Sequence, residues 1–271
     1  MPLVRIDART GSLRAQFAEY WLYRELLYFL AWRDVKVRYR QTFLGVAWTV
    51  LQPALAMLLF TIFFGRFAGM PSDGIPYAVF AYAGLLPWTF FANSVSSAGQ
   101  SLITNPDLVS KVYLPRMLVP SAPILAGLLD LAIAFSLLIF LLPYFQVPVT
   151  SSILLLPLLI FLAVLFTLAV GLSTAAINVR YRDVRYALPF LIQIGLFASP
   201  VIYPSTLVPA PWRALLLLNP LTGIIEGFRS ALFGRPFDWT ALGVSAAVTV
   251  TLLLLSARYF RRVETHFADV I

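Results

Sequence analysis

Residues 33–53 read RDVKVRYRQTFLGVAWTVLQP, and this stretch sets a cluster of basic side chains directly before a long uncharged segment. The cations of the cluster are Arg33, Lys36, Arg38 and Arg40. No charged residue follows them until Arg66. A membrane helix accounts for this pattern, because about 20 apolar residues span the hydrocarbon layer and basic residues collect on its cytoplasmic side. We therefore predict a first membrane span over residues 43–64.

The composition of the whole chain also indicates an integral membrane protein. Of its 271 residues, 60% are hydrophobic and 12% are charged, and the mean hydropathy is +0.85. Soluble domains carry about 25% charged residues. The net charge of +8 is concentrated beside the apolar runs, which favours a membrane over nucleic acid as its partner. Cysteine is absent and histidine occurs once, at His266, so we expect neither a disulfide framework nor a histidine-based metal site.

Uncharged runs divide the chain into six expected membrane helices. The longest run, 131–179, exceeds one span and is interrupted by PYFQVPVTSS at 143–152, so it is interpreted as two helices. The predicted spans are 43–64, 76–99, 117–142, 153–176, 186–203 and 239–257. The predicted fold class is an all-α integral membrane protein with six transmembrane helices. An N-terminal amphipathic interface helix precedes the first span, and an outer re-entrant helical hairpin lies between spans five and six.

The basic residues set the expected orientation. An even number of spans puts both termini on one side, and cytoplasmic termini place 16 of the 20 basic residues inside, as the positive-inside rule requires. The basic residues left outside are Arg66, Arg213, Arg229 and Arg235. The expected organisation is a cytoplasmic N-terminal region (1–42), a six-span domain (43–257) and a cytoplasmic tail (258–271). We expect no cleavable signal peptide, because residues 1–14 lack an apolar core.

Residues 19–40, EYWLYRELLYFLAWRDVKVRYR, have the pattern of an interfacial helix. The residues that recur at helical spacing are Trp21, Tyr28, Trp32, Val35 and Tyr39. Arg33, Lys36 and Arg40 lie on another face, where they can meet anionic lipid while the aromatic rings sit at headgroup depth. The helix either serves only as a topology anchor, or its cations also receive a negatively charged substrate headgroup.

Residues 101–116, SLITNPDLVSKVYLPR, predict a short cytoplasmic helix over 105–114. Its signals are Asn105 as the N-cap, Pro106 and Asp107 in the first turn, and Pro115 after the end. One interpretation is a turn that merely joins two spans. The other is a rigid handle for another protein, formed by Asp107, Lys111 and Arg116.

Residues 211–236 hold two apolar pieces, split by Asn219-Pro220 and ended by Gly234. Each piece is too short to cross a bilayer, so the pair should form the outer re-entrant or interfacial hairpin. Within it, Glu226 and Arg229 are spaced to pair with each other.

Asp130 is the one acidic residue near the middle of a predicted span. A carboxylate at this depth is a functional-site hypothesis, although a structural hydrogen bond to a neighbouring helix is the favoured alternative.

The sequence supplies no energy source or catalytic motif of its own. Its two lysines, Lys36 in DVKV and Lys111 in VSKV, do not belong to a phosphate-binding loop. Paired carboxylates, a nucleophile elbow and zinc-ligand spacing are also missing, so we do not expect an enzyme. A proton-driven carrier would carry a series of titratable groups in its spans, and this chain does not.

Four stretches match one known family in its order and together cover most of residues 20–236. They are RYRQTFLGVAWTVLQP (38–53), GLLPWTFFANSVSSAGQSLITNPDLVSKVYLPR (84–116), SPVIYP (199–204) and LNPLTGIIEGFRSALFG (218–234). The chain thereby resembles the permease subunit of ABC-2-type polysaccharide exporters, the family of O-antigen, capsule and teichoic-acid exporters. Residues 1–19 do not align with it.

The resemblance implies a homodimer joined to two copies of a separate cytoplasmic ABC ATPase, which would use ATP and Mg²⁺ while this chain binds no cofactor. The substrate would be an undecaprenyl-diphosphate-linked polysaccharide, moved across the bacterial cytoplasmic (inner) membrane between the protomers. Residues 105–114 are similar to the coupling helix, with Asn105, Asp107, Lys111 and Arg116 toward the ATPase. Residues 211–236 resemble the outer gate, with Asn219, Glu226 and Arg229. The alternatives are an ABC-2 exporter of drugs or lipids, an ATP-independent carrier and a membrane-embedded glycan transferase.

Such a substrate assigns roles to two groups of side chains. A diphosphate at the inner leaflet requires cations, and the candidates are Arg33, Lys36, Arg38 and Arg40. Arg38 and Arg40 rank above Lys36, because a guanidinium binds phosphate in a bidentate manner. Aromatic rings that stack on sugars would line the channel, and the candidates are Trp48, Tyr82, Trp88, Phe90 and Phe91, with Phe60, Phe63 and Phe64. Packing or lipid contact is the alternative for these rings, and we expect it for more than half of them.

Overall fold

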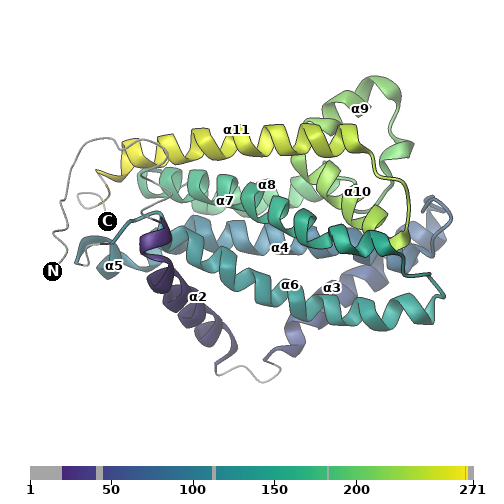
Figure 1. Ribbon diagram of the computed structural model, residues 1–271, viewed down its shortest axis with the longest axis horizontal. Coiled ribbons are helices and arrows are strands. Elements are labelled where there is room, and N and C mark those ends of the chain that lie inside the picture. The colour runs from purple at the N-terminus through teal and green to yellow at the C-terminus, as the bar shows by residue number, and fades with distance from the viewer. Residues whose placement is uncertain (1–19, 41–44, 112–113, 182, 266, 268–271) are drawn as a thin grey trace.

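The computed structural model describes residues 20–40, 45–111, 114–181, 183–265 and 267, and within them every regular element is helical (Figure 1). In chain order the longer helices are α2 (Arg24–Tyr39), α3 (Ala47–Phe60), α4 (Tyr77–Thr104), α6 (Leu118–Tyr144), α7 (Leu156–Arg180), α8 (Val184–Phe197), α10 (Pro220–Phe233) and α11 (Trp239–Glu264). The short ones are the π-helical turn η1 (Thr61–Phe67), α5 (Pro106–Ser110), η2 (Ser151–Leu155), η3 (Ser205–Leu207) and α9 (Ala210–Leu217).

Helix length and hydropathy make the chain a multi-pass membrane protein. Five helical stretches are long and apolar enough to cross a membrane, namely Ala47–Phe67, Tyr77–Thr104, Leu118–Tyr144, Ser151–Arg180 and Trp239–Glu264. They confirm five of the six predicted spans. The fifth predicted span, 186–203, corresponds to a shorter apolar helix, α8. Its 14 residues extend about 21 Å, less than the hydrocarbon thickness of about 30 Å.

Proline explains why α8 ends earlier than predicted. Pro200 lacks a backbone donor and disfavours helical geometry at Ser199, and α8 ends two residues before this serine. The chain continues through turns to Pro204, and Val201 and Ile202 are buried there against the rest of the protein. The segment 198–204 is therefore a packed, non-helical end of the fifth apolar stretch.

Helix α4 forms the centre of the bundle, with α3, α6, α7 and α10 packed around it (Figure 1). Small residues let the helices approach closely, since a Cβ added to Gly171 would lie 3.1 Å from Ala98. Polar contacts between helices occur at both ends of α4. The Tyr82 hydroxyl donates to the Ala134 carbonyl (2.7 Å), and the Asn178 amide donates to the Gly99 carbonyl (2.7 Å).

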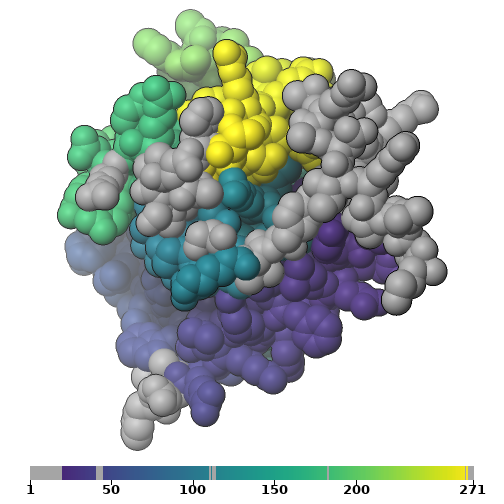
Figure 2. Space-filling model, turned by 90° about the vertical axis from the view of Figure 1, so that its left-hand side faces the viewer, coloured from purple at the N-terminus to yellow at the C-terminus, as the bar shows by residue number. Residues whose placement is uncertain are grey.

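One end of the bundle gathers α2, α5 and the C-terminal end of α11, as Figure 2 shows. Helix α2 packs across α6, where Leu30 is buried against Leu118 and Ala122. The Tyr20 hydroxyl donates to the Met117 carbonyl (3.2 Å) and thereby fixes the start of this segment. We call this the α5 end of the bundle.

The opposite end carries the α9–α10 pair, which bends at Asn219-Pro220 as predicted. Asn219 caps α10 by accepting from the Leu221 N–H (3.1 Å), and Gly234 ends it in the left-handed region at φ 65°. Helix α10 is buried along most of its length, between α4, α7 and α11, whereas α9 is exposed. The depth of this pair in a membrane stays a prediction.

Candidate functional site

Cations and aromatic rings share the outer face of α2. A shallow cavity of about 340 Å³, the α2 groove, is lined by Phe29, Trp32, Arg33, Lys36, Val37 and Arg40. The Lys36 ammonium lies 5.7 Å from the centre of the Trp32 ring, and Arg33 pairs with Asp34 (2.9 Å). Trp32 and its neighbour Phe29 are exposed. This combination of exposed rings and cations is typical of a helix at the membrane interface.

Arg38 lies apart from the other α2 cations and makes an ion pair with Asp130 of α6. The Tyr39 hydroxyl also donates to Asp130 and lies 3.1 Å from the Thr49 hydroxyl. The favoured interpretation of Asp130, a bond to a neighbouring helix, is confirmed. Arg38 therefore lines a different cavity from Arg40 and already has a carboxylate partner, and its role toward a headgroup stays a prediction.

A second cavity, of about 380 Å³, surrounds this ion pair, and we call it the Asp130 cavity. Its walls come from the end of α2 and from α3, α4 and α6. The polar side chains in its lining are Arg38, Tyr39, Thr49, Gln52, Thr89, Asn93, Ser94, Ser96, Ser97 and Asp130. Trp48 and Phe90 add aromatic surface. So many hydrogen-bonding groups beside an apolar bundle mark this cavity as a candidate binding site.

The predicted channel aromatics divide into two groups. Trp48 is 51% exposed at the Asp130 cavity, and Phe90 forms part of the cavity wall although this residue is only 4% exposed. Tyr82, Trp88 and Phe91 are buried inside the bundle, where Tyr82 has no exposed surface and Phe91 stacks on Phe166 at 5.2 Å between ring centres. These three rings cannot line an open path in this conformation, since their burial between helices corresponds to the packing alternative.

The remaining aromatic candidates lie along α3 and η1. Phe60 and Phe64 are half-buried and contact each other edge to face, 5.8 Å apart. Phe63 is exposed. A lipid, a second protein copy or a channel could cover such a ring.

The predicted coupling helix is shorter than expected, because α5 spans only Pro106–Ser110. Asn105 precedes it but does not cap it. Its amide donates instead to the Ser101 carbonyl at the end of α4 (2.8 Å), so the predicted N-cap contact is wrong. Asp107 and Lys111 pair across one turn at 2.7 Å, and their side chains are 77% and 73% exposed.

Arg116 connects the α5 end to the C-terminus of α11. Its guanidinium donates to the carbonyl of Glu264, at the last residue of α11. Val109 and Leu114 are buried on either side of the turn and fix it to the bundle. The tip formed by Pro106 and Asp107 therefore projects from an anchored base, and residues 112–113 lie outside the described part of the chain.

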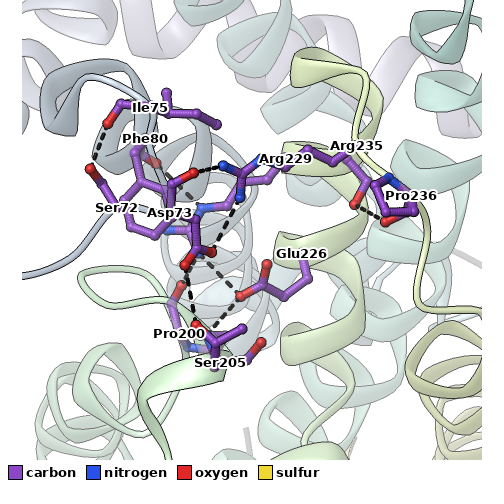
Figure 3. A network of polar contacts seen from close by, with 12 residues as sticks. Ser72, Asp73, Ile75, Phe80, Pro200, Ser205, Glu226, Arg229, Arg235 and Pro236 are labelled. Atoms are coloured by element: carbon purple, nitrogen blue, oxygen red, sulfur yellow. Dashed lines mark hydrogen bonds and ion pairs between the residues drawn. The ribbon is translucent and has the colours of Figure 1, made fainter.

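Arg229 is the centre of the opposite end (Figure 3). Although only 2% exposed, it donates to the carbonyls of Pro200 and Val201, both at 2.7 Å. The predicted pair with Glu226 is confirmed at 3.4 Å. The guanidinium also lies 3.5 Å from the centre of the Phe80 ring. Burial lowers the pKa of Arg229 to about 10, and Glu226 opposes this shift, so the side chain stays charged at neutral pH.

Further contacts join the loops around Arg229. Glu226 accepts from the backbone N–H of Ser205 (3.1 Å), and Arg235 pairs with Asp73 (3.2 Å) (Figure 3). The Thr206 hydroxyl also donates to Asp73 (3.2 Å). The loop before α4, the turns after α8, the middle of α10 and the turn after its C-terminal end are thus held together. The sequence pattern predicted only the Glu226–Arg229 spacing, because spacing alone does not reveal which distant carbonyls an arginine meets.

Comparison with known proteins decides the family. The profile described as ABC-2 type transporter matches residues 25–233, well over half of the chain. The chain belongs to the ABC-2 transporter family. Most of the helices described above, from α2 to α10, lie within the matched region of this ABC-2 transporter.

Sequence similarity to individual members of the family covers most of this chain. It is 33% identical to the O-antigen export system permease protein RfbA of Myxococcus xanthus over 257 residues, 93% of this chain and 98% of the relative. It is 26% identical to an RfbA of Klebsiella pneumoniae over 91% of this chain and 95% of the relative. It is 23% identical to the polysialic acid transport protein KpsM of Escherichia coli over 86% and 91%.

Proposed function

We propose that this ABC-2 transporter is the permease subunit of an exporter that moves a lipid-linked polysaccharide, such as O-antigen, capsule or teichoic acid, across the bacterial cytoplasmic membrane. The observation that carries the proposal is its similarity, over almost its full length, to a permease of O-antigen export. Relatives named for O-antigen and for polysialic acid support a polysaccharide more than a small drug. The lipid carrier in this proposal is undecaprenyl diphosphate.

The α2 groove is the proposed contact for the diphosphate headgroup. Lys36 and Arg40 line it together with exposed aromatic rings, so a headgroup could meet charge while the lipid chain stays beside apolar surface. Arg33 contributes less, because Asp34 already neutralises part of its charge.

A separate ATPase drives transport in this proposal. Two copies of it would bind a homodimer of this chain on the cytoplasmic side, where both termini lie. The exposed Asp107–Lys111 pair on the anchored α5 turn supports a docking role for the α5 end. A protruding turn with a fixed base transmits force better than a loose loop, because its base cannot yield independently of the bundle.

Complementation tests the proposal. A host deleted for its own O-antigen permease receives this chain with its partner ATPase, and surface glycan and intracellular lipid-linked glycan are both measured. We expect surface glycan to return and the intracellular pool to fall. A matched strain whose ATPase lacks the lysine of its phosphate-binding loop should accumulate the intracellular form. The proposal would be contradicted if lipid-linked glycan stayed inside the cells that carry the intact pair while a drug or a simple lipid was exported.

A further inference from the structure

We infer that the Asp130 cavity is a binding site for an uncharged sugar segment of the glycan, recognised through its hydroxyl groups. The inference deepens the proposed function and rests on it, since it concerns how a part of that substrate is held. The cavity lies within the bundle beside the last turn of α2, and the family comparison assigns it no role.

Unsatisfied hydrogen-bonding groups are the first observation. Gln52 and Asn93, which are exposed, and Ser96 and Ser97, which are half-buried, line the cavity, and among the described residues their side chains have no hydrogen-bond partner. Ser94 is only 2% exposed, and its hydroxyl has no partner there either. Buried polar atoms are nearly always paired in folded proteins, which makes Ser94 unusual. The other four groups lie on helices long and apolar enough to cross a membrane, where lipid offers no hydrogen-bond partner. A ligand that brings its own hydroxyl groups would supply the missing partners.

The chemistry of these groups favours a polyol. The amides of Gln52 and Asn93 each offer two donors and a carbonyl acceptor, and a serine hydroxyl both donates and accepts. A sugar hydroxyl has the same dual capacity, so each can bond in either direction. Trp48, which is 51% exposed, provides flat apolar surface for the less polar face of a sugar ring.

The charges in the cavity argue against a phosphate. Arg38 is neutralised by Asp130, so the pair contributes no net positive charge. A diphosphate that reached Arg38 would also meet the Asp130 carboxylate and be repelled. An uncharged sugar instead gains two strongly polar partners from the same pair.

The α2 groove lies beside this neutral cavity on the same helix turn. Lys36 and Arg40 are four residues apart and share a face, whereas Arg38 lies between them in sequence and points to the other side. The two sites are thus separated by about the width of a helix, roughly 10 Å, and the sugars attached to a headgroup in the groove would have to pass around α2 to reach the cavity. The volume of about 380 Å³ is at the lower end of the range for small-molecule sites, which limits the bound part to a short segment.

The test compares lining residues with and without a free hydrogen-bonding group. The removing variant is Gln52→Ala with Asn93→Ala. The matched control is Thr89→Val, because Thr89 lines the same cavity but its hydroxyl already donates to the Leu85 carbonyl (2.8 Å). A second variant, Ser96→Ala with Ser97→Ala, removes two hydroxyls with little change in volume. Each is purified as the complex with its ATPase in lipid nanodiscs, and its melting temperature is checked.

Two probes separate sugar from headgroup. The first is the repeat-unit oligosaccharide released from the host glycan, free of lipid and phosphate, and the second is undecaprenyl diphosphate without sugar; calorimetry measures binding of each. We expect both cavity variants to weaken oligosaccharide binding about tenfold, the Thr89→Val control to change it less than twofold, and headgroup binding to stay unchanged in all of them.

Either of two results would overturn the inference. One is oligosaccharide binding that both cavity variants retain, and the other is no saturable oligosaccharide binding by the unmutated complex. Both leave the proposed function standing if the unmutated chain restores surface glycan in the complementation assay. Failure of that assay removes the proposed function instead, so the two failures are distinguishable.

Discussion

Replacement of Arg229 by alanine tests how much the buried arginine stabilises the end of the bundle that carries α9 and α10. Its guanidinium supplies two donors at 2.7 Å to the carbonyls of Pro200 and Val201, and it pairs with Glu226 at 3.4 Å. The alanine variant leaves these acceptors inside the protein without that partner. It also leaves a cavity beside the Phe80 ring.

The expected cost follows from these contacts. A buried acceptor that loses its partner costs about 1–3 kcal/mol, and breaking a buried ion pair costs about 3–5 kcal/mol. These terms overlap because one side chain makes all the contacts, so we expect a total loss of about 4 kcal/mol in the free energy of unfolding. For a protein of this size, the melting temperature should fall by about 10 °C.

Thermal unfolding of the purified permease in detergent measures this loss. The matched control is Arg235→Ala, which breaks the more exposed pair with Asp73 at the same end. Pairs of that kind are worth about 0–1 kcal/mol, so the control should melt within about 3 °C of the unmutated chain. Equal melting temperatures for the two variants would refute the reasoning, because burial would then add nothing to the value of the arginine.

Gly84 offers an independent check on the same site. A Cβ at this position would lie 2.7 Å from the Arg229 guanidinium and 3.0 Å from the Val201 carbonyl. Gly84→Ala should therefore displace the arginine and destabilise the protein. In the Arg229→Ala background the same change should cost less, since the guanidinium is gone. If the losses in stability of the two single variants simply added in the double variant, the close contact between Gly84 and the Arg229 guanidinium would be contradicted.

Further predictions concern the α5 end and the two cavities. Lys111→Glu should reduce copurification with the ATPase and substrate-stimulated ATP hydrolysis, because the exposed charge of α5 is reversed. Lys36→Gln combined with Arg40→Gln should abolish surface glycan without altering membrane insertion, which fractionation measures. Asp130→Asn should lower the melting temperature by leaving Arg38 unpaired, and adding Arg38→Gln should restore most of the loss.

Each of these predictions has a matched control. Exchanging the charges of Asp107 and Lys111 keeps their pair intact, so loss of assembly in the exchanged variant isolates docking from helix stability. Arg24→Gln removes a cation of α2 outside the groove and should leave export normal. A double variant at Asp130 and Arg38 that melts as low as the single one would argue that the pair is not the reason for the loss.

Hydropathy was sufficient to predict most of the fold. Uncharged runs located the starts of five spans within four residues, because a membrane helix must satisfy its backbone internally and cannot carry many charges. The last of these helices continues seven residues beyond its predicted end, because its charged C-terminal part stays helical outside the uncharged run. The α8 stretch was overextended because its hydropathy continues past Pro200, although helical geometry does not. Hydropathy measures solvent preference, whereas the end of a helix depends on local backbone donors.

The site was less predictable than the fold. The partner of Asp130 was expected on a neighbouring helix, but Arg38 is 92 residues away in sequence and no local pattern specifies it. Tyr82 and Phe91 could not be distinguished from Trp48, because an aromatic ring suits a core and an open surface equally well. The pair of Glu226 and Arg229 was predicted correctly, since their spacing on one helix fixes their distance.

The contact between Arg116 and the last residue of α11 joins the base of the α5 turn to a helix that runs along the bundle to its opposite end (Figure 1). Helix α11 contains 26 residues and is about 39 Å long. It begins at Trp239, shortly after the turn that contains Arg235. A tilt of the α5 turn that displaced Arg116 would move the near end of this rod. The far end would then displace the turn in which Arg235 pairs with Asp73. Movement at the α5 end would in this way reach the opposite end of the bundle through a single helix.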